Sequence, residues 1–269
     1  MAREPSDEGA GVLLEGKVCV ITGLGPGLGR EIAVLFAQEG ATVVIGSRTE
    51  AYVAEVAAEI EAAGGAVLGV PTDITDRSQC ERILQAAVDT FGGIDVVLQN
   101  GFTTPPFESF PDTDLAGWRR AMDVNLWGTL ELCQAAVPHL RARGGGSIVV
   151  ISSMIIRKVL PLQGGYAISK GALNTAVQVM ARELGPDHIR VNSVVPGWMM
   201  GPSVDGYFAM MEAAGKPRDE LYAEIAANMA LGVIPTDDEC ARAAVFLASD
   251  LSSMVTGAAI DVNGGEVFH

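Results

Sequence analysis

The stretch VITGLGPGLGREIA, residues 20–33, places four glycines within seven positions, between an apolar run and a segment with helical character. Its glycines follow the spacing T-G-x3-G-x-G from Thr22, and the fingerprint G-x-G-x-x-G cannot be placed on them. Glycine lets the backbone approach a ligand closely, and a helix that begins near Leu28 directs unpaired N–H groups at an anion. The stretch therefore predicts a phosphate cradle, with a plain tight turn as the alternative.

Short β-branched runs alternate with longer Ala/Leu/Glu-rich stretches on the C-terminal side of this loop. The predicted strands are residues 17–22, 42–46, 66–70, 94–98, 147–152, 189–195 and 258–262. The predicted helices are residues 28–39, 50–63, 77–91, 114–142, 164–184 and 236–249. The alternation, with strands that are nearly continuous in apolar residues, indicates an α/β fold whose parallel sheet is covered by helices on both faces.

Length, charge and cysteine usage limit the classes of function. The 269 residues suit one α/β domain, expected at 12–269, after an acidic tail at 1–11 that we expect to be disordered and that does not resemble a signal peptide. The net charge of −15 disfavours nucleic acid and anionic membranes as partners, and no apolar run is long enough to span a membrane. The four cysteines lie far apart without histidines at metal spacing, so we expect no metal site and a cytoplasmic protein.

One segment, residues 197–235, interrupts the alternation for roughly forty residues, a length that usually carries a function. We expect it to form a mobile apolar lid over a hydrophobic ketone or alcohol, with helix-on-helix packing as the alternative. Its large apolar residues are Trp198, Met199, Met200, Tyr207, Phe208, Met210 and Met211. Its only basic residues are Lys216 and Arg218, so no basic cluster points to an acyl-carrier substrate.

The end of the second strand indicates which dinucleotide binds. Sheets that bind NAD usually place an acidic residue there for the ribose 2′-hydroxyl, whereas NADP requires positive charge and donors for the 2′-phosphate. Here the strand runs into Ser47 and Arg48, with no carboxylate before Glu50. The pattern favours NADP(H), and NAD(H) is the alternative. Pro26 weakens the prediction slightly, because it removes one amide donor from the loop.

Three residues of the segment 147–171 suggest catalysis. Tyr166 and Lys170 are four apart on a predicted helix and therefore share one face. An ammonium group beside a phenol favours the phenolate and lowers the tyrosine pKa, so the pair suits proton transfer to a carbonyl oxygen. Ser153 ends a predicted strand at the edge where ligands of parallel sheets bind.

The glycine loop together with Ser153, Tyr166 and Lys170 in the spacing S-x12-Y-x3-K resembles the short-chain dehydrogenase/reductase family from about residue 14 to the end of the chain. The resemblance implies a seven-stranded Rossmann-like sheet and hydride transfer between a nicotinamide and a carbonyl or alcohol carbon. It implies that Tyr166 is the general acid/base, that Ser153 holds the substrate oxygen and that Lys170 binds the nicotinamide ribose. Asn125 matches the family residue that fixes a water of the proton relay, and an amide paired with backbone is the alternative.

The same resemblance, with the loop and strand ends, predicts the residues that contact the dinucleotide. They are Gly23, Gly25, Pro26, Gly27, Leu28, Ser47, Arg48, Asp73, Ile74, Asn100, Gly101, Tyr166, Lys170, Pro196, Gly197 and Met199. For Asp73 an ordinary helix N-cap is the alternative. Three positions depart from the family pattern: Phe102 places bulk where the family has none, Gly201 stands where the family often has a threonine that contacts the nicotinamide amide, and Pro26 stands where NADP-dependent members often have serine or arginine.

Three functions follow as hypotheses: an NADP(H)-dependent oxidoreductase, an NAD(H)-dependent alcohol dehydrogenase, and a catalytically silent dinucleotide-binding sensor. Because fold does not decide function, the presence of Tyr166, Lys170, Ser153 and Asn125 together favours an enzyme. A homotetramer is expected from the resemblance. Leu173, Ala176, Val177 and Met180 are spaced to form an association face on the helix, unless that helix is buried within one subunit.

Overall fold

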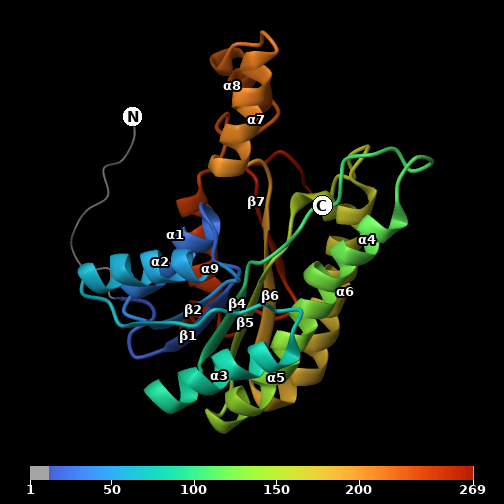
Figure 1. Ribbon diagram of the computed structural model, residues 1–269. Helices are drawn as coiled ribbons and strands as arrows, with labels where there is room; N and C mark the ends of the chain where they lie inside the picture. The colour runs from blue at the N-terminus through green and yellow to red at the C-terminus, as the bar shows by residue number, and fades with distance from the viewer. Residues whose placement is uncertain (1–11, 269) are drawn as a thin grey trace.

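The computed structural model describes residues 12–268, so the tail predicted at residues 1–11 lies outside the described residues. All seven predicted strands form, and they make one parallel sheet in the order β3-β2-β1-β4-β5-β6-β7 (Figure 1). They are β1 (Val18–Thr22), β2 (Thr42–Gly46), β3 (Val67–Gly69), β4 (Val96–Gln99), β5 (Gly146–Ile151), β6 (Ile189–Pro196) and β7 (Ala259–Val262). The strand order reverses between β1 and β4, and ligands of such sheets bind at the carboxyl ends of the strands near this point.

Helices cover both faces of the sheet, as the alternation predicts (Figure 1). On one face lie α1 (Leu28–Gln38), α2 (Glu50–Ala62) and α9 (Asp237–Ala248). On the other lie α3 (Arg77–Phe91), α5 (Thr129–Ala142) and α6 (Gly164–Leu184), with α4 (Leu115–Met122) against α6. The helix predicted over residues 114–142 is interrupted, because a π-helical segment at Asp123–Gly128 separates α4 from α5. Short 3₁₀ turns lie at Met154–Ile156, Gly185–Asp187 and Asp250–Ser252.

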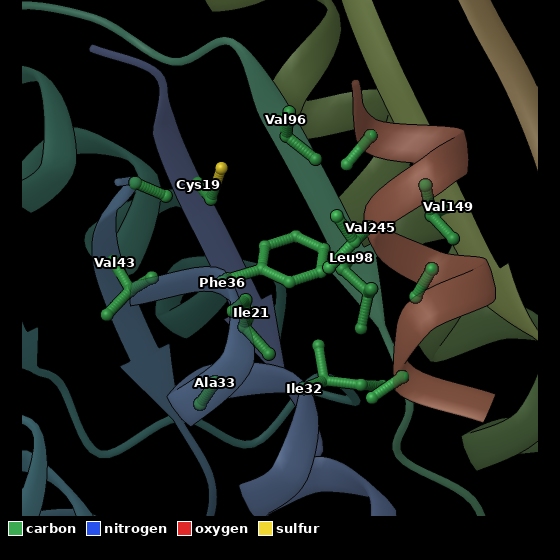
Figure 2. Close-up of a cluster of buried hydrophobic side chains, with 14 of the residues drawn as sticks. Cys19, Ile21, Ile32, Ala33, Phe36, Val43, Val96, Leu98, Val149 and Val245 are labelled. Atoms are coloured by element: carbon green, nitrogen blue, oxygen red, sulfur yellow. The ribbon is translucent and has the colours of Figure 1, made fainter. Parts of the chain in front are cut away.

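The register of the strands divides their side chains between two hydrophobic clusters. Val20 pairs with Val44 and Val97 and lies in the cluster under α3, α5 and α6. Its neighbours Cys19 and Ile21 point to the opposite face and contact the side of α1 and α9. Figure 2 shows the Phe36 ring of α1 among them, and this side chain is fully buried. Burying such a ring stabilises the fold by roughly 1.5–3 kcal/mol. The two clusters together fix the sheet, whose carboxyl edge carries the site.

The association face predicted on α6 is only partly exposed in this fold. Leu173 and Val177 are buried in the cluster under α3, α5 and α6, and Ala176 and Met180 pack against it. The alternative, burial within one subunit, therefore holds for Leu173 and Val177, whereas Ala176 and Met180 stay partly exposed, and a homotetramer stays a prediction that sedimentation can test. Among the helices of the described residues, none combines the length and the hydropathy needed to cross a membrane.

Candidate active site

A cleft of about 450 Å³ opens at the carboxyl edge of the sheet, where the loops after β1, β2, β4, β5 and β6 meet. Most predicted site residues line it: Gly23, Gly25, Pro26, Gly27, Leu28, Ser47, Arg48, Asp73, Ile74, Asn100, Gly101, Ser153, Tyr166, Pro196, Gly197 and Met199. The two others, Asn125 and Lys170, are buried and do not line the cleft. The structure thus brings together residues from most of the length of the chain.

The glycine-rich loop lies directly against the end of β4. The Gly23 N–H donates to the Gly46 carbonyl at 3.0 Å, and a Cβ on Gly23 would lie 1.9 Å from the backbone nitrogen of Gly101. The Asn100 side chain donates from Nδ2 to the Gly23 carbonyl at 2.8 Å, so it supports the loop. Gly27, with φ of 92°, is the N-cap of α1. Because Gly27 also lines the cleft, the N-terminus of α1 opens onto it and provides donors for an anion.

Two groups at the end of β2 are suited to a ligand. The Ser47 hydroxyl oxygen is buried and has no hydrogen-bond partner in the structure. The neighbouring Arg48 is exposed and pairs with no carboxylate of residues 12–268. A buried polar atom without a partner costs free energy, and both side chains line the cleft. The residues present therefore fit a dinucleotide, with its pyrophosphate at α1 and its adenosine ribose at the end of β2.

Asp73 holds the loop after β3, but it is not a helix N-cap, which was the alternative for this residue. Asp76 is the N-cap of α3, accepting from the Ser78 N–H, so Asp73 does not cap the helix. Instead Asp73 Oδ1 accepts from the backbone N–H of Thr75 at 3.0 Å and from its hydroxyl at 2.7 Å. This turn keeps the Asp73 side chain at the cleft, where contact with an adenine stays a prediction.

Ser153 and Tyr166 both line the cleft and lie next to each other. Ser153 follows β5, and the first turn of α6 places the Tyr166 hydroxyl within hydrogen-bonding reach of it. The Phe102 ring lies 6.0 Å from the Tyr166 ring and is 50% exposed, so it lines the cleft as its bulk suggested. A phenol, a hydroxyl and an apolar ring thus share one open corner, which suits the carbonyl group of an apolar molecule.

Lys170 lies one turn below Tyr166 on α6 and is 2% exposed. Its Nζ donates to the Ile151 carbonyl at 2.8 Å and lies 5.9 Å from the centre of the Tyr166 ring. Burial lowers the pKa of Lys170 to about 7. Burial also raises the pKa of Tyr166, although the hydrogen bond to Ser153 opposes the shift. The expected lowering of the tyrosine pKa by Lys170 is therefore not found in the protein alone, because the cation is itself disfavoured by burial.

Asn125 lies in the π-helical segment, a rare element that often marks functional sites. Its side-chain oxygen accepts from the Thr103 N–H at 2.8 Å, and its Nδ2 donates to the Thr103 carbonyl and to the Ser169 hydroxyl, both at 2.9 Å. The side chain is thus an amide paired with backbone, the predicted alternative. It ties the loop after β4 to α6, next to the turn that carries Tyr166, and a part in a proton relay stays a prediction.

The segment 197–235 forms two helices, α7 (Pro202–Ala213) and α8 (Arg218–Ala226), that project above the carboxyl edge of the sheet (Figure 1). They enclose a small hydrophobic cluster of their own around Phe208, which is fully buried. Trp198, Met200, Tyr207 and Met211 pack against this cluster, whereas Met210 is exposed. Of the seven large apolar residues predicted for the lid, only Met199 lines the cleft. Helix-on-helix packing, the alternative, therefore describes most of these side chains, and a role of the segment as a lid stays a prediction.

Several cleft residues were not predicted from the sequence. They are Leu24, Gly29, Thr72, Thr75, Phe102, Val124, Ile151, Ser152, Gly201, Pro202, Ser203, Val204 and Asp237, of which Gly29 belongs to the glycine motif and Phe102 and Gly201 depart from the family pattern. Most of them adjoin predicted residues, so widening each motif by one or two positions finds them. Asp237 is different, because it is the first residue of α9, follows the segment 197–235 and adjoins none of the predicted residues. No motif in the sequence marks it.

Known proteins resemble this chain along most of its length. A family model described as enoyl-(acyl carrier protein) reductase matches residues 23–266. The chain is 35% identical to a 3-oxoacyl-[acyl-carrier-protein] reductase of Thermotoga maritima over 94% of this chain and 99% of that protein. It is 34% identical to a cis-4-hydroxycyclohexanecarboxylate dehydrogenase of Sinomonas cyclohexanicum over 93% of this chain and 96% of the other.

A solved structure has the same fold. A short-chain type dehydrogenase/reductase from Mycobacterium ulcerans superposes with a TM-score of 0.84 at 30% identity, covering 94% of this chain and 90% of the other. The likeness thus extends beyond the dinucleotide loop to the sheet and helices that carry Ser153 and Tyr166.

Proposed function

Because the chain belongs to the short-chain dehydrogenase/reductase family and is thus an oxidoreductase of alcohols and carbonyls that uses a nicotinamide cofactor, we propose that it prefers NADP(H) and acts on an apolar small molecule. The observation that carries the proposed chemistry is the meeting of Tyr166 and Ser153 at one corner of the cleft, with Lys170 directly behind them. A silent sensor would not require this arrangement.

In carbonyl reduction, Tyr166 is the proton donor. Its raised pKa keeps the phenol protonated at neutral pH, so that the proton is available for the carbonyl oxygen. Ser153 holds the same oxygen through its hydroxyl and fixes its distance from Tyr166. When bound, the reduced nicotinamide supplies the hydride to the carbonyl carbon. In alcohol oxidation the phenolate of Tyr166 accepts the proton of the alcohol. Because the pKa of Tyr166 is raised, the phenolate forms only at higher pH, and oxidation therefore requires a higher pH than reduction.

Lys170 stabilises the negative charge that develops on the Tyr166 oxygen as the proton leaves. The ammonium group is buried and lies beside both the Tyr166 ring and the Phe102 ring, 5.4 Å from the latter's centre. Charge interactions are stronger in such a dry environment than in water. The interaction is available only when Lys170 is protonated, and its pKa of about 7 makes that condition depend on pH.

Replacement of Lys170 by methionine is expected to remove a pH dependence from carbonyl reduction. In the wild type, kcat/KM for the carbonyl should fall as pH rises through an inflection at or above about pH 7, because Lys170 loses its charge. Lys170→Met should show a lower and flatter profile between about pH 6 and 9. The matched control is Lys158→Met, which removes an exposed lysine paired with Glu266 and should keep the inflection. An inflection that persists in Lys170→Met would mean that another group tunes Tyr166.

Two loops, one of which contributes Phe102 to the cleft, support the proposal of an apolar substrate. The loops that precede α4 and α6 run side by side, joined by a hydrogen bond from the Glu108 N–H to the Leu162 carbonyl at 3.2 Å. They carry the exposed apolar side chains of Phe107, Phe110, Val159 and Leu162, and the loop before α4 also contains Phe102, which lines the cleft. Exposed apolar groups that gather near a cleft favour contact with an apolar ligand.

The two basic residues of the segment 197–235 do not favour an acyl-carrier substrate. Lys216 forms an ion pair with Glu224, and Arg218 forms one with Asp205, so both charges are already neutralised. The test is a panel of ketones and secondary alcohols, offered free and as acyl-carrier thioesters, with NADPH and NADH. We expect turnover of free apolar ketones with NADPH, and turnover of the carrier-bound compounds alone would contradict the substrate proposal.

A further inference from the structure

The carboxyl group of Asp237 lies between the glycine-rich loop and the start of α7. Asp237 is the first residue of α9, is 9% exposed and lines the cleft. A Cβ on Gly27 would lie 2.8 Å from its Oδ2, and a Cβ on Gly201 would lie 2.6 Å from both of its carboxyl oxygens. The carboxyl therefore occupies the space that a side chain at position 201 would take.

This carboxyl group has no partner in the part of the chain that the structure describes. Its Oδ1 is buried without a hydrogen bond, and no arginine or lysine of residues 12–268 pairs with it. Gly27 and Gly201 are the N-caps of α1 and α7, so three helix N-termini, with that of α9, converge on it. Helix N-termini favour an anion, and a buried polar atom without a partner is usually satisfied by a ligand or water.

Acidic groups face Asp237 from the elements around it. Glu31 of α1 and Asp205 of α7 both raise its pKa, and with burial as the largest cause that pKa reaches about 6. Each of these neighbours has its own cation, Arg30 for Glu31 and Arg218 for Asp205. On α9 itself, Asp238 pairs with Arg242, and Glu239 accepts from the Thr236 N–H at the helix cap. No cation is therefore left over for Asp237 among these groups.

We propose that Asp237 is a ligand of the dinucleotide that takes a proton from solvent on binding, so that its carboxyl group donates an O–H to the pyrophosphate. The proposal rests on the dinucleotide site proposed above. The reason is electrostatic: a pyrophosphate at the N-terminus of α1 comes close to Gly27 and hence to the Asp237 carboxyl, and two anions repel strongly where water is excluded. Protonation removes the repulsion and turns an orphaned acceptor into a donor.

The sign of the pH effect follows from linkage. The free protein already binds the proton below about pH 6, so binding there costs nothing extra. Above that pH each binding event must take up a proton, and the dissociation constant rises with pH until the pKa of the bound form is passed. This direction is opposite to that of a 2′-phosphate, whose own second ionisation near pH 6 strengthens its contact with a cation as pH rises.

The experiment compares wild type, Asp237→Asn and Asp238→Asn as full chains in calorimetric titrations with NADH, which lacks the 2′-phosphate, and with NADPH. Asparagine keeps the shape and a donor but cannot titrate, and Asp238 is a neighbouring carboxylate outside the cleft. From about pH 5.5 to 8, NADH affinity should fall at least about tenfold more in wild type and Asp238→Asn than in Asp237→Asn. Titrations in buffers of different ionisation enthalpy near pH 7 should show roughly one proton more taken up by wild type than by Asp237→Asn.

Each outcome bears on the proposal. Equal pH dependence and equal proton uptake in wild type and Asp237→Asn would overturn it and leave the dinucleotide site standing, with any shared slope due to groups such as Lys170. If Asp237→Asn does not fold, proton uptake by the wild type is compared with that of Lys170→Met, because uptake that persists in Lys170→Met supports the proposal and zero uptake near pH 7 contradicts it. Failure of wild type to bind either dinucleotide at any pH would overturn the proposed function as well.

Discussion

Replacing Tyr166 by phenylalanine is expected to lower the turnover number by about 10²–10⁴-fold, the range typical for loss of a general acid. The variant keeps the ring that packs 6.0 Å from Phe102 and loses only the hydroxyl that lies within reach of Ser153. Because the side-chain shape is preserved, dinucleotide affinity and the melting temperature should change little. The measurement is steady-state turnover on the best ketone of the panel, with dinucleotide binding followed by calorimetry.

The matched control is Tyr52→Phe, since Tyr52 lies on α2 and does not line the cleft. This variant should turn over like the wild type. Turnover of Tyr166→Phe within a few-fold of wild type would show that another group donates the proton, and Ser153 would then be the next candidate.

The choice of dinucleotide should be reversed by changes at the end of β2. Arg48 pairs with no carboxylate among residues 12–268, so it can meet a 2′-phosphate with a charge-assisted contact worth about 1.5–3 kcal/mol. Arg48→Ala should therefore weaken NADPH binding about tenfold or more and leave NADH little changed. Ser47→Asp should go further, since its carboxylate would accept from the free ribose hydroxyls of NADH and repel the phosphate of NADPH. We expect the ratio of the two dissociation constants to shift by roughly 10²-fold or more.

The control for the added charge is Thr49→Asp, because Thr49 is the N-cap of α2 and does not line the cleft. Its effect on the ratio should be small, and aspartate is also a good N-cap. Equal affinity of the wild type for NADH and NADPH, or equal weakening of both by Arg48→Ala, would contradict the NADP preference. The glycine-rich loop would still be a dinucleotide site in that case.

The sheet and the catalytic corner could be predicted because their signals are local. Each strand is a short apolar run bounded by a turn, and Tyr166 and Lys170 sit four residues apart on one helix, so that spacing alone brings them together. Ser153 needed one further step, the rule that strands of a parallel sheet end at the same edge. The π-helical segment within 114–142 has no such local signal, because the apolar pattern of these residues is that of an ordinary helix.

The properties that could not be predicted depend on burial and on long connections. A lysine four residues from a tyrosine suggests a cation, but only the depth of the Lys170 side chain explains why its charge is disfavoured near neutral pH. Asp237 lies beside Gly27 because α9 packs along α1, and the bridge between Met200 and Thr236 closes the segment 197–235 into a loop just before it. The same closure lets the large residues of that segment pack on one another, and the pattern of apolar residues alone does not distinguish this from a lid.

Transfer of deuterium from the dinucleotide to the product tests the central claim most directly. Reduced NADP that carries deuterium at both positions of the hydride-donating carbon is incubated with the protein and an apolar ketone, and the alcohol is analysed by mass spectrometry and NMR. Direct hydride transfer beside Tyr166 predicts one deuterium on the carbinol carbon and a single configuration there, while label from deuterated water appears only on the exchangeable hydroxyl. Alcohol without deuterium at that carbon, or no alcohol from any ketone of the panel with either dinucleotide and correctly folded protein, would contradict the account.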